Sequence, residues 1–245
     1  PGDNGNAEAT PTENLVSQYE MADGTDFSWN IHAANPYEGR EPRFYASINF
    51  NGQQWRGRQL EFWQGGKDGI NVSKVDYCCT GYLLRKTADE GVDVINGKGG
   101  MKEASILFRV GSLYLDYAEA LNEAEGPVDD VYKYVDAIRK RAGLPGLAKG
   151  LDKDKMRERI QHERQIELAF EAGHRYFDCH RWKIAEKTDN GYMHGMNITA
   201  TNKVDYSKRS TVGDSRVFEK KHYLFPIPQS EMDKRIGLVQ SPYWE

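Results

Sequence analysis

The sequence has little of what defines several common protein classes. Its 245 residues include only three cysteines. Cys78 and Cys79 are adjacent, and Cys179 is remote from both. An odd count without a C-x-x-C pair predicts neither a disulfide framework nor a zinc site, so we expect buried free thiols. No apolar run approaches the roughly 18 residues that a membrane-spanning helix needs.

An excess of positive charge is also missing. Lysine and arginine total 33 against 37 aspartate and glutamate residues, which gives a formal net charge of −4. Nucleic-acid-binding proteins usually carry a basic stripe, so this balance argues against a nucleic-acid partner. The pair His162–Glu163 lacks the second histidine of an H-E-x-x-H motif. We therefore predict no metal ligands and no cofactor.

What is present is a dense charged and aromatic run from Glu163 to Trp182, ERQIELAFEAGHRYFDCHRW. We expect a helix over 152–172. Its inward stripe at helical spacing comprises Met156, Ile160, Ile166 and Phe170. Glu163, Glu167 and Glu171 stand four residues apart on this helix and would repel one another if they had no partners. Buried carboxylates of this kind need cations nearby.

Two interpretations of these carboxylates are open. In the first they belong to a structural ion-pair cluster that locks helices together. Its expected members are Glu163, Glu167, Glu171, Arg139, Arg141, Arg175 and Arg181. In the second, two of the three glutamates, or Asp178, are the acid and base of a glycoside hydrolase, which needs an open cleft between them. We favour the first and predict no catalytic residues, because nearby arginines would keep the acids ionised and leave no proton donor.

The chain changes character twice along its length. Residues 1–100 are loop-rich, with one β-prone run over 43–50. Its expected buried face comprises Phe44, Ala46, Ile48 and Phe50. Residues 101–188 are expected to be helical, ending in a helix over 174–187, and residues 189–245 to be a loop with a short helix near 230–236. These three parts predict a single mainly α region with long irregular loops and a small β component in its N-terminal third.

Two of the expected helices form a hairpin of about 34 residues, the length of one tetratricopeptide repeat. The first has an apolar face of Leu113, Tyr117, Ala120, Leu121 and Ala124. The second has a face of Val128, Val131, Val135, Ile138 and Ala142. The hairpin is either an ordinary helix pair in a larger core, which we favour, or part of a helical-repeat interaction scaffold without a small ligand.

The run from Glu163 to Trp182 resembles the C-terminal signature of the SusD/RagB family, E-R-x-x-E-[LF]-x-[FG]-E-G-x-R-[FYW]-x-D-x-x-R-W, with Ala172 standing before Gly173. Other stretches resemble further motifs of the family in the same order. They are Glu41–Tyr45 (EPRFY), Thr80–Lys86 (TGYLLRK), Leu113–Asn122 (LYLDYAEALN), Ile138–Pro145 (IRKRAGLP) and Tyr223–Pro228 (YLFPIP). The matches extend over nearly the whole chain.

The resemblance implies a SusD-like helical fold and a cell-surface protein that binds glycans for a bacterial outer-membrane uptake system. Such a protein is anchored by an N-terminal lipid and delivers its oligosaccharide, or another nutrient, to a TonB-dependent transporter. Family members are about twice as long, so the resemblance identifies this chain as their C-terminal half. Its partners would be the ligand, the transporter and the N-terminal half of the same protein.

Composition also points to a region where a ligand could bind. Sugars are held by flat aromatic faces and by planar polar side chains. In the loop-rich first hundred residues the candidates are Trp29, His32, Tyr37, Arg40, Trp55 and Trp63. No family motif assigns a ligand to these positions, so the prediction rests on residue type alone.

Overall fold

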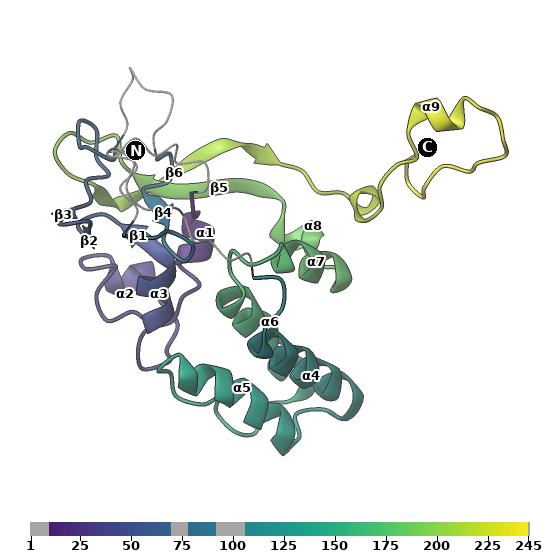
Figure 1. Ribbon diagram of the computed structural model, residues 1–245, viewed down its shortest axis with the longest axis horizontal. Coiled ribbons are helices and arrows are strands. Elements are labelled where there is room, and N and C mark those ends of the chain that lie inside the picture. The colour runs from purple at the N-terminus through teal and green to yellow at the C-terminus, as the bar shows by residue number, and fades with distance from the viewer. Residues whose placement is uncertain (1–9, 70–77, 92–105, 245) are drawn as a thin grey trace. The chain divides into compact units, whose positions relative to one another are not determined.

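The computed structural model describes residues 10–69, 78–91 and 106–244. It is mainly helical with small two-stranded sheets, as the sequence predicts (Figure 1). The chain divides into two compact units. The larger comprises Pro1–Ala172 and Met193–Val212, and the smaller comprises Gly173–Tyr192 and Gly213–Glu245. Within the described ranges, no helix is both long and apolar enough to span a bilayer.

The N-terminal segment of the larger unit combines short helices with short strands. Its elements are α1 (Glu13–Val16), α2 (Trp29–His32), α3 (Pro42–Ser47), β1 (Ile48–Phe50), β2 (Gln54–Trp55), β3 (Arg58–Gln59) and β4 (Tyr82–Leu84). β1 pairs antiparallel with β4, with Ile48 opposite Leu84, and β2 pairs antiparallel with β3. The two small sheets hold this loop-rich segment together.

The β-prone run over 43–50 is helical in its first half, which corrects the prediction of one strand. Pro42 is the first residue of α3, where its fixed φ suits a helix start and its missing N–H is not needed. Only the last three residues continue as β1. As a result Arg43 is buried on α3 together with Phe44.

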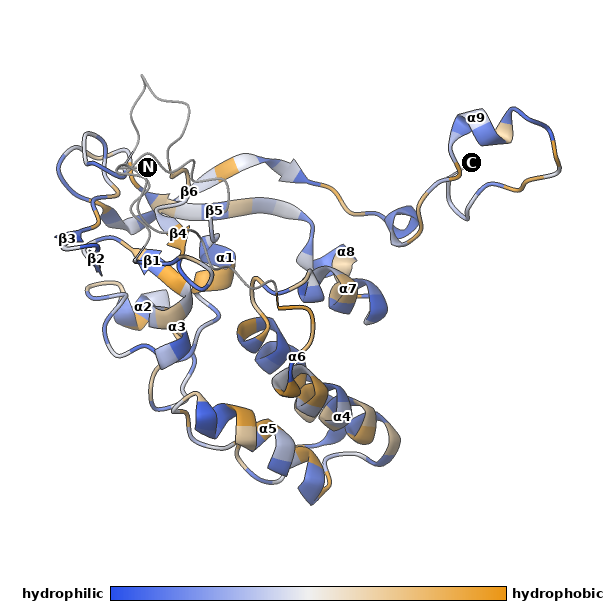
Figure 2. Ribbon diagram, viewed as in Figure 1, coloured by the Kyte–Doolittle hydropathy of each residue, from blue (hydrophilic) through white to orange (hydrophobic). Residues whose placement is uncertain are grey.

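Three longer helices follow: α4 (Val110–Glu125), α5 (Asp129–Arg141) and α6 (Lys153–Glu167). α4 packs against both of the others, and α4 with α5 makes the predicted hairpin. Figure 2 shows hydrophilic and apolar residues interleaved along all three helices. On α5 the predicted face is confirmed at Val131, Val135 and Ile138, which are buried.

The predicted face of α4 is wrong except at Leu121, which is half-buried and packs against the core. Leu115 and Ala118 are buried, whereas Leu113 and Tyr117 are 54% and 46% exposed. The buried side of α4 also carries polar residues, among them Asn122, whose amide donates to a backbone carbonyl. Because polar residues with satisfied hydrogen bonds can be buried, the apolar pattern alone assigned the wrong face.

α6 begins as predicted, with the Asp152 carboxylate capping the backbone N–H of Lys155, but it ends at Glu167 instead of Ala172. The side chain of Lys86 donates to the carbonyls of Glu167 and Ala169 at 2.9 and 3.0 Å. A cation that takes the last carbonyls of a helix stabilises its end. Phe170 beyond it has a positive φ and is 37% exposed, so it does not continue the inward stripe.

The main core of the larger unit joins distant parts of the chain. It contains Tyr19, Phe44, Ile48, Phe62, Tyr82, Ile166 and Met196. Met196 belongs to β5 (Gly191–Asn197), which reaches the N-terminal segment through a 2.8 Å bond from its N–H to the Thr80 carbonyl. A Cβ at Gly195 would lie 2.7 Å from backbone atoms of Thr80, so only glycine permits this approach.

β5 pairs with β6 (Asp205–Arg216) in a long two-stranded ribbon (Figure 1). The ribbon corrects the prediction that the part of 189–245 before its short helix is a loop, and it places the longest of the described strands outside the N-terminal third. The smaller unit holds α7 (His174–Arg181), α8 (Ala185–Thr188), the 3-10 helix η1 (Lys220–Tyr223) and α9 (Gln229–Met232). The expected helix over 174–187 is therefore divided, with Lys183 at positive φ between its halves.

The cysteines are not linked by disulfides. Cys78 and Cys179 are buried free thiols, which confirms the prediction for both, and Cys79 is half-buried. Burial raises the pKa of the Cys78 thiol to about 11. A thiol in that state is a poor nucleophile at neutral pH.

Candidate functional site

A buried ion-pair network surrounds the carboxylates of α6. Glu163 is 1% exposed and accepts hydrogen bonds from two arginines. Arg43 Nη1 lies 2.6 Å from one carboxylate oxygen, and Arg139 Nη1 lies 3.1 Å from the other. Arg43 comes from α3 and Arg139 from the last turn of α5. Glu163 therefore ties α6 to two other elements.

Glu167 lies one turn further along and is bound by three guanidiniums. Arg109 and Arg141 donate to its Oε1 at 2.7 and 2.6 Å, and Arg43 donates to its Oε2 at 3.0 Å. Glu171, beyond the end of the helix, is held by Arg109 at 2.8 Å and by Lys86 at 2.5 Å. Arg109 therefore bridges two carboxylates that would otherwise repel each other.

The network continues into the N-terminal segment through Glu20 and Glu41. Arg139 Nη2 donates to Glu20 at 2.9 Å, and Arg159 forms a second ion pair with Glu20. Arg43 Nε donates to Glu41 at 2.6 Å. The Arg139–Glu20 contact joins residues 119 positions apart. The N-terminal segment is thus fastened to α5 and α6 by charged hydrogen bonds.

The cations lower the pKa of two of these acids, Glu167 and Glu171. Desolvation by burial raises the pKa of Glu167, but hydrogen bonding from Arg109 and the charge of Arg43 outweigh it, and the pKa is lowered from 4.5. The pKa of Glu171 is also lowered, because Arg109 and Lys86 outweigh desolvation. A general acid needs a raised pKa in order to carry a proton at neutral pH. Neither glutamate meets that requirement, which argues for a structural role.

The structure brings together five of the residues predicted for this cluster: Glu163, Glu167, Glu171, Arg139 and Arg141. The other two, Arg175 and Arg181, lie on α7 in the smaller unit, and Arg181 donates to Asp178 at 2.9 Å. The network also has members that were not predicted: Arg43, Lys86, Arg109, Arg159, Glu20 and Glu41. Glu41, Arg43 and Lys86 stand in the motif stretches EPRFY and TGYLLRK, so the charged positions of those motifs were the available signal for these three.

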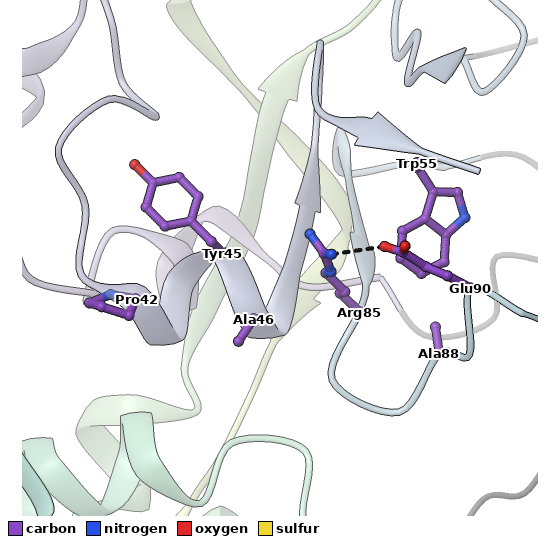
Figure 3. A pocket seen from close by; sticks show the side chains of 7 residues that line it. All are labelled: Pro42, Tyr45, Ala46, Trp55, Arg85, Ala88 and Glu90. Carbon is purple, nitrogen blue, oxygen red and sulfur yellow. Dashed lines mark hydrogen bonds and ion pairs between the residues drawn. The ribbon is translucent and has the colours of Figure 1, made fainter. Parts of the chain in front are cut away.

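An open hollow of about 530 Å³ lies on the N-terminal segment. We call it the Trp55 hollow, after the residue that β2 supplies to its wall. It is lined by Pro42, Tyr45, Ala46, Trp55, Arg85, Ala88 and Glu90 (Figure 3). Its volume falls within the usual range for small-molecule sites, roughly 300–1,000 Å³.

The side chains of the Trp55 hollow combine aromatic faces with planar polar groups. Figure 3 shows Arg85 between Tyr45 and Trp55, with its guanidinium paired to Glu90; the Nη2–Oε1 distance is 2.8 Å. The Arg85 guanidinium carbon also lies 5.5 Å from the centroid of the Trp55 ring. An aromatic ring beside a guanidinium and a carboxylate is a suitable surface for a sugar, whose ring stacks while its hydroxyls donate and accept.

A second hollow, of about 350 Å³, contains another predicted tryptophan. We call it the Trp29 hollow. It is lined by Glu13, Asn14, Ser17, Trp29, His194 and Arg209. The Trp29 Nε1 donates to Glu13 Oε1 at 2.5 Å, and the Arg209 guanidinium lies 3.0 Å from the centroid of the Trp29 ring. Glu13, His194 and Arg209 were not predicted, since they stand far apart in the sequence.

The remaining predicted ligand residues serve the fold. Arg40 is 2% exposed and donates to the carbonyls of Pro36, Val16 and Tyr19, which corrects its assignment to a binding surface. Tyr37 packs on the Phe50 ring at 4.4 Å, His32 stacks on Phe27 at 5.2 Å, and Trp63 packs against the core. The six candidates therefore do not form one platform. In the part of the chain that the structure describes, no group of His, Cys, Asp and Glu is arranged to hold a metal ion.

The sequence is similar to known proteins over its whole length. The model of the SusD family (SusD_RagB) matches residues 1–244. A curated SusD-like protein, P25 of Formosa agariphila, is 42% identical over 82 residues, which cover 32% of this chain and 15% of that protein. A second, SusD-like protein P2 of the same organism, is 29% identical over 154 residues, or 58% of this chain and 26% of that protein.

Solved structures give the same result. A SusD-like protein from Bacteroides fragilis has 32% identity and a TM-score of 0.74, covering 96% of this chain and 47% of that one. A SusD-like carbohydrate binding protein, also from Bacteroides fragilis, has 27% identity and a TM-score of 0.76, covering 91% and 47%. The chain thus spans about half the length of these solved relatives. With a family match from residue 1 to residue 244, the chain belongs to the SusD family.

Proposed function

We propose that this chain is part of a cell-surface glycan-binding protein, and that the Trp55 hollow contributes to its binding surface. The observation that carries the proposal is the grouping of Trp55, Tyr45, Arg85 and Glu90 around one open hollow. Membership of the SusD family supports it, as does similarity to a relative described as a carbohydrate binding protein. Because the chain spans about half of that relative, the activity of the whole protein is part of the proposal.

The proposed mechanism is capture without bond cleavage. The apolar face of a sugar ring stacks on the exposed side of Trp55, which is half-buried and backed by the core. Such ring contacts contribute about 0.5–1.5 kcal/mol beyond the area they bury. Arg85 donates to sugar oxygens, and Glu90 accepts from hydroxyls. Since Arg85 and Glu90 already pair with each other, the two groups are held in place before a ligand arrives.

We further propose that the whole protein acts in an outer-membrane uptake system. In that setting it is anchored by a lipid and passes its oligosaccharide to a TonB-dependent transporter. Weak, reversible binding suits such a transfer, because a ligand held by one stacking surface leaves quickly. The proposal rests on the family and on the open form of the Trp55 hollow, which leaves the ligand accessible to a partner.

The test is affinity electrophoresis of the chain through gels that contain a panel of polysaccharides, with the same samples assayed for new reducing ends. We expect retardation by at least one glycan and no new reducing ends. Trp55→Ala should abolish most of the retardation, whereas the matched control Trp55→Phe, which keeps an aromatic face, should retain much of it. New reducing ends, or equal retardation of all three proteins, would contradict the proposal.

A second surface favours an additional role in assembly. Val110, Leu113 and Tyr117 leave an exposed apolar side on α4, and soluble proteins rarely expose contiguous apolar patches without a use for them. We propose that this side packs against the N-terminal half of the whole protein. A longer protein should protect the amide hydrogens of α4 from exchange more strongly than this chain does; equal protection would contradict the packing.

A further inference from the structure

We infer that the Trp29 hollow is a second subsite that binds a negatively charged substituent of the glycan, a carboxylate or a sulfate ester. The inference rests on the proposed function and adds a chemical class of substrate to it. It is carried by Arg209, a cation placed in an open hollow with part of its hydrogen-bonding capacity unused.

Arg209 is held firmly on β6. Its guanidinium lies over the Trp29 ring at 3.0 Å from the centroid, and its Nη1 donates to the carbonyls of Tyr206 and Lys208 at 2.7 and 3.1 Å. Among the described residues nothing accepts a hydrogen bond from its Nη2. A guanidinium fixed by stacking on one side presents its free donors in one direction, which is the arrangement that recognises carboxylate and sulfate oxygens.

No carboxylate neutralises this cation directly. Glu13 and Asp205 influence Arg209 electrostatically, yet neither forms an ion pair with it in the described part of the chain. Both oxygens of Glu13 are occupied: Oε1 accepts from Trp29 at 2.5 Å, and Oε2 accepts from the Tyr82 hydroxyl at 2.6 Å. Asp205 Oδ1 accepts from the backbone and side chain of Ser207 at 3.0 and 2.5 Å.

The local charge favours an anion. Arg40 is the other cation that acts on Glu13, and it too lacks an ion pair within the described ranges, since its donors go to backbone carbonyls. Among the residues that line the hollow, Arg209 is the cation and Glu13 the acid. Because both oxygens of Glu13 already accept hydrogen bonds from Trp29 and Tyr82, the guanidinium of Arg209 remains the charged group that can bind an incoming anion.

The other lining groups suit the polar part of a sugar. His194 is half-buried, Asn14 is exposed, and Ser17 contributes a hydroxyl. The Asn14 Oδ1 accepts from the backbone N–H of His194 at 2.7 Å, which leaves the amide NH₂ available as a donor. The volume of about 350 Å³ lies near the lower end of small-molecule sites,. A single charged sugar residue is the ligand that this combination fits.

The experiment is calorimetric titration of the chain with matched pairs of oligosaccharides. One pair is tetragalacturonate and its carboxyl-reduced neutral form, and the other is a sulfated galactan tetrasaccharide and its desulfated form. We expect at least one acidic member to bind about ten-fold more tightly than its neutral counterpart, the effect typical of a charge-assisted hydrogen bond. The pair that shows the preference identifies the anion as carboxylate or sulfate.

Three variants locate the preference. Arg209→Gln should bring the ratio of acidic to neutral affinity close to one, and Arg209→Lys should give an intermediate ratio. Lys208→Gln is the matched control, because it removes the same charge from an exposed neighbour on β6 and should leave the ratio unchanged. A partly unfolded variant lowers both affinities equally, so the ratio remains a valid measure even if Arg209→Gln is less stable.

The outcomes separate this inference from the proposed function. Binding of neutral glycans with no preference for acidic ones in the wild type overturns the charged subsite and leaves glycan binding intact. A preference that survives Arg209→Gln also overturns it. If neither the oligosaccharides nor the polysaccharide panel binds, the proposed function is wrong and the subsite is lost with it.

Discussion

The ion-pair network around α6 and the two tryptophan hollows use the same residue types in opposite ways. In the network Glu163, Glu167 and Glu171 are nearly fully buried, and each meets at least two cations. In the hollows Trp29, Trp55, Arg85 and Arg209 are half-buried, and Arg209 has no ion-pair partner among the described residues. The residue type alone therefore does not tell whether an arginine or a glutamate supports the fold or binds a ligand. Saturation of their hydrogen bonds inside the protein indicates architecture, and unused donors beside an open surface indicate recognition.

The largest expected effect is at the centre of the network. Glu167→Ala leaves Arg43 and Arg109 with a missing partner in a buried setting, and breaking a buried ion pair on one side destabilises by about 3–5 kcal/mol. Urea denaturation followed by circular dichroism would measure the loss. A loss of less than about 1 kcal/mol in the free energy of unfolding is typical of exposed ion pairs. That result would contradict a stabilising role of the buried network.

Acid should weaken the ion-pair network. The pKa values of Glu20, Glu167 and Glu171 are lowered from 4.5 in the folded protein. Their stabilisation is complete above the unfolded pKa and is lost as the pH falls through the lowered folded values. The free energy of unfolding should fall steeply below about pH 4.5. Glu13 and Glu41 act in the opposite sense, since desolvation raises the pKa of each. A shallower fall in Glu171→Gln than in the wild type, but not in Glu13→Gln, would assign part of the fall to Glu171.

A moderate effect is expected in the Trp55 hollow. Trp55→Ala should weaken glycan affinity by about 1 kcal/mol, or roughly five-fold, through loss of the stacking face. Its stability should fall less than that of Glu167→Ala, because Trp55 is only half-buried. Calorimetric titration and urea denaturation of the same samples would test both parts. A large loss of stability with unchanged affinity would make Trp55 a core residue.

The smallest effect is expected at an exposed ion pair whose hydrogen-bond distances are comparable to those of the buried network. Arg157 donates to both oxygens of Glu123 at 2.5 and 2.6 Å, but both side chains are over a third exposed. Glu123→Ala should therefore change the free energy of unfolding by less than about 1 kcal/mol. The same urea experiment that measures Glu167→Ala supplies this control. Equal losses in the two variants would show that burial does not distinguish the network.

The sequence predicted the fold class, the helix hairpin and five members of the network, because motif order and helical spacing are local information. It missed the residues whose role depends on distant contacts. Arg43 was assigned to a strand, although Pro42 starts a helix there. The ribbon of β5 and β6 is polar along much of its length, so it lacks the alternation that identifies a strand. His194 lies on β5 and Arg209 on β6, so the fold of the ribbon is what brings both residues to Trp29.

The long sequence separations in the network bear on how the protein is made. Arg43 pairs with Glu163, which lies 120 positions later in the sequence. Glu20 pairs with Arg159, which lies 139 positions later. During synthesis the early segment therefore emerges from the ribosome with cations and acids whose counterparts have not yet been translated. Closing such long loops is slow. The larger unit also contains Met193–Val212, so it can complete its folding only after that stretch has left the exit tunnel. A pause or a chaperone before that stage would act on a chain that is still open.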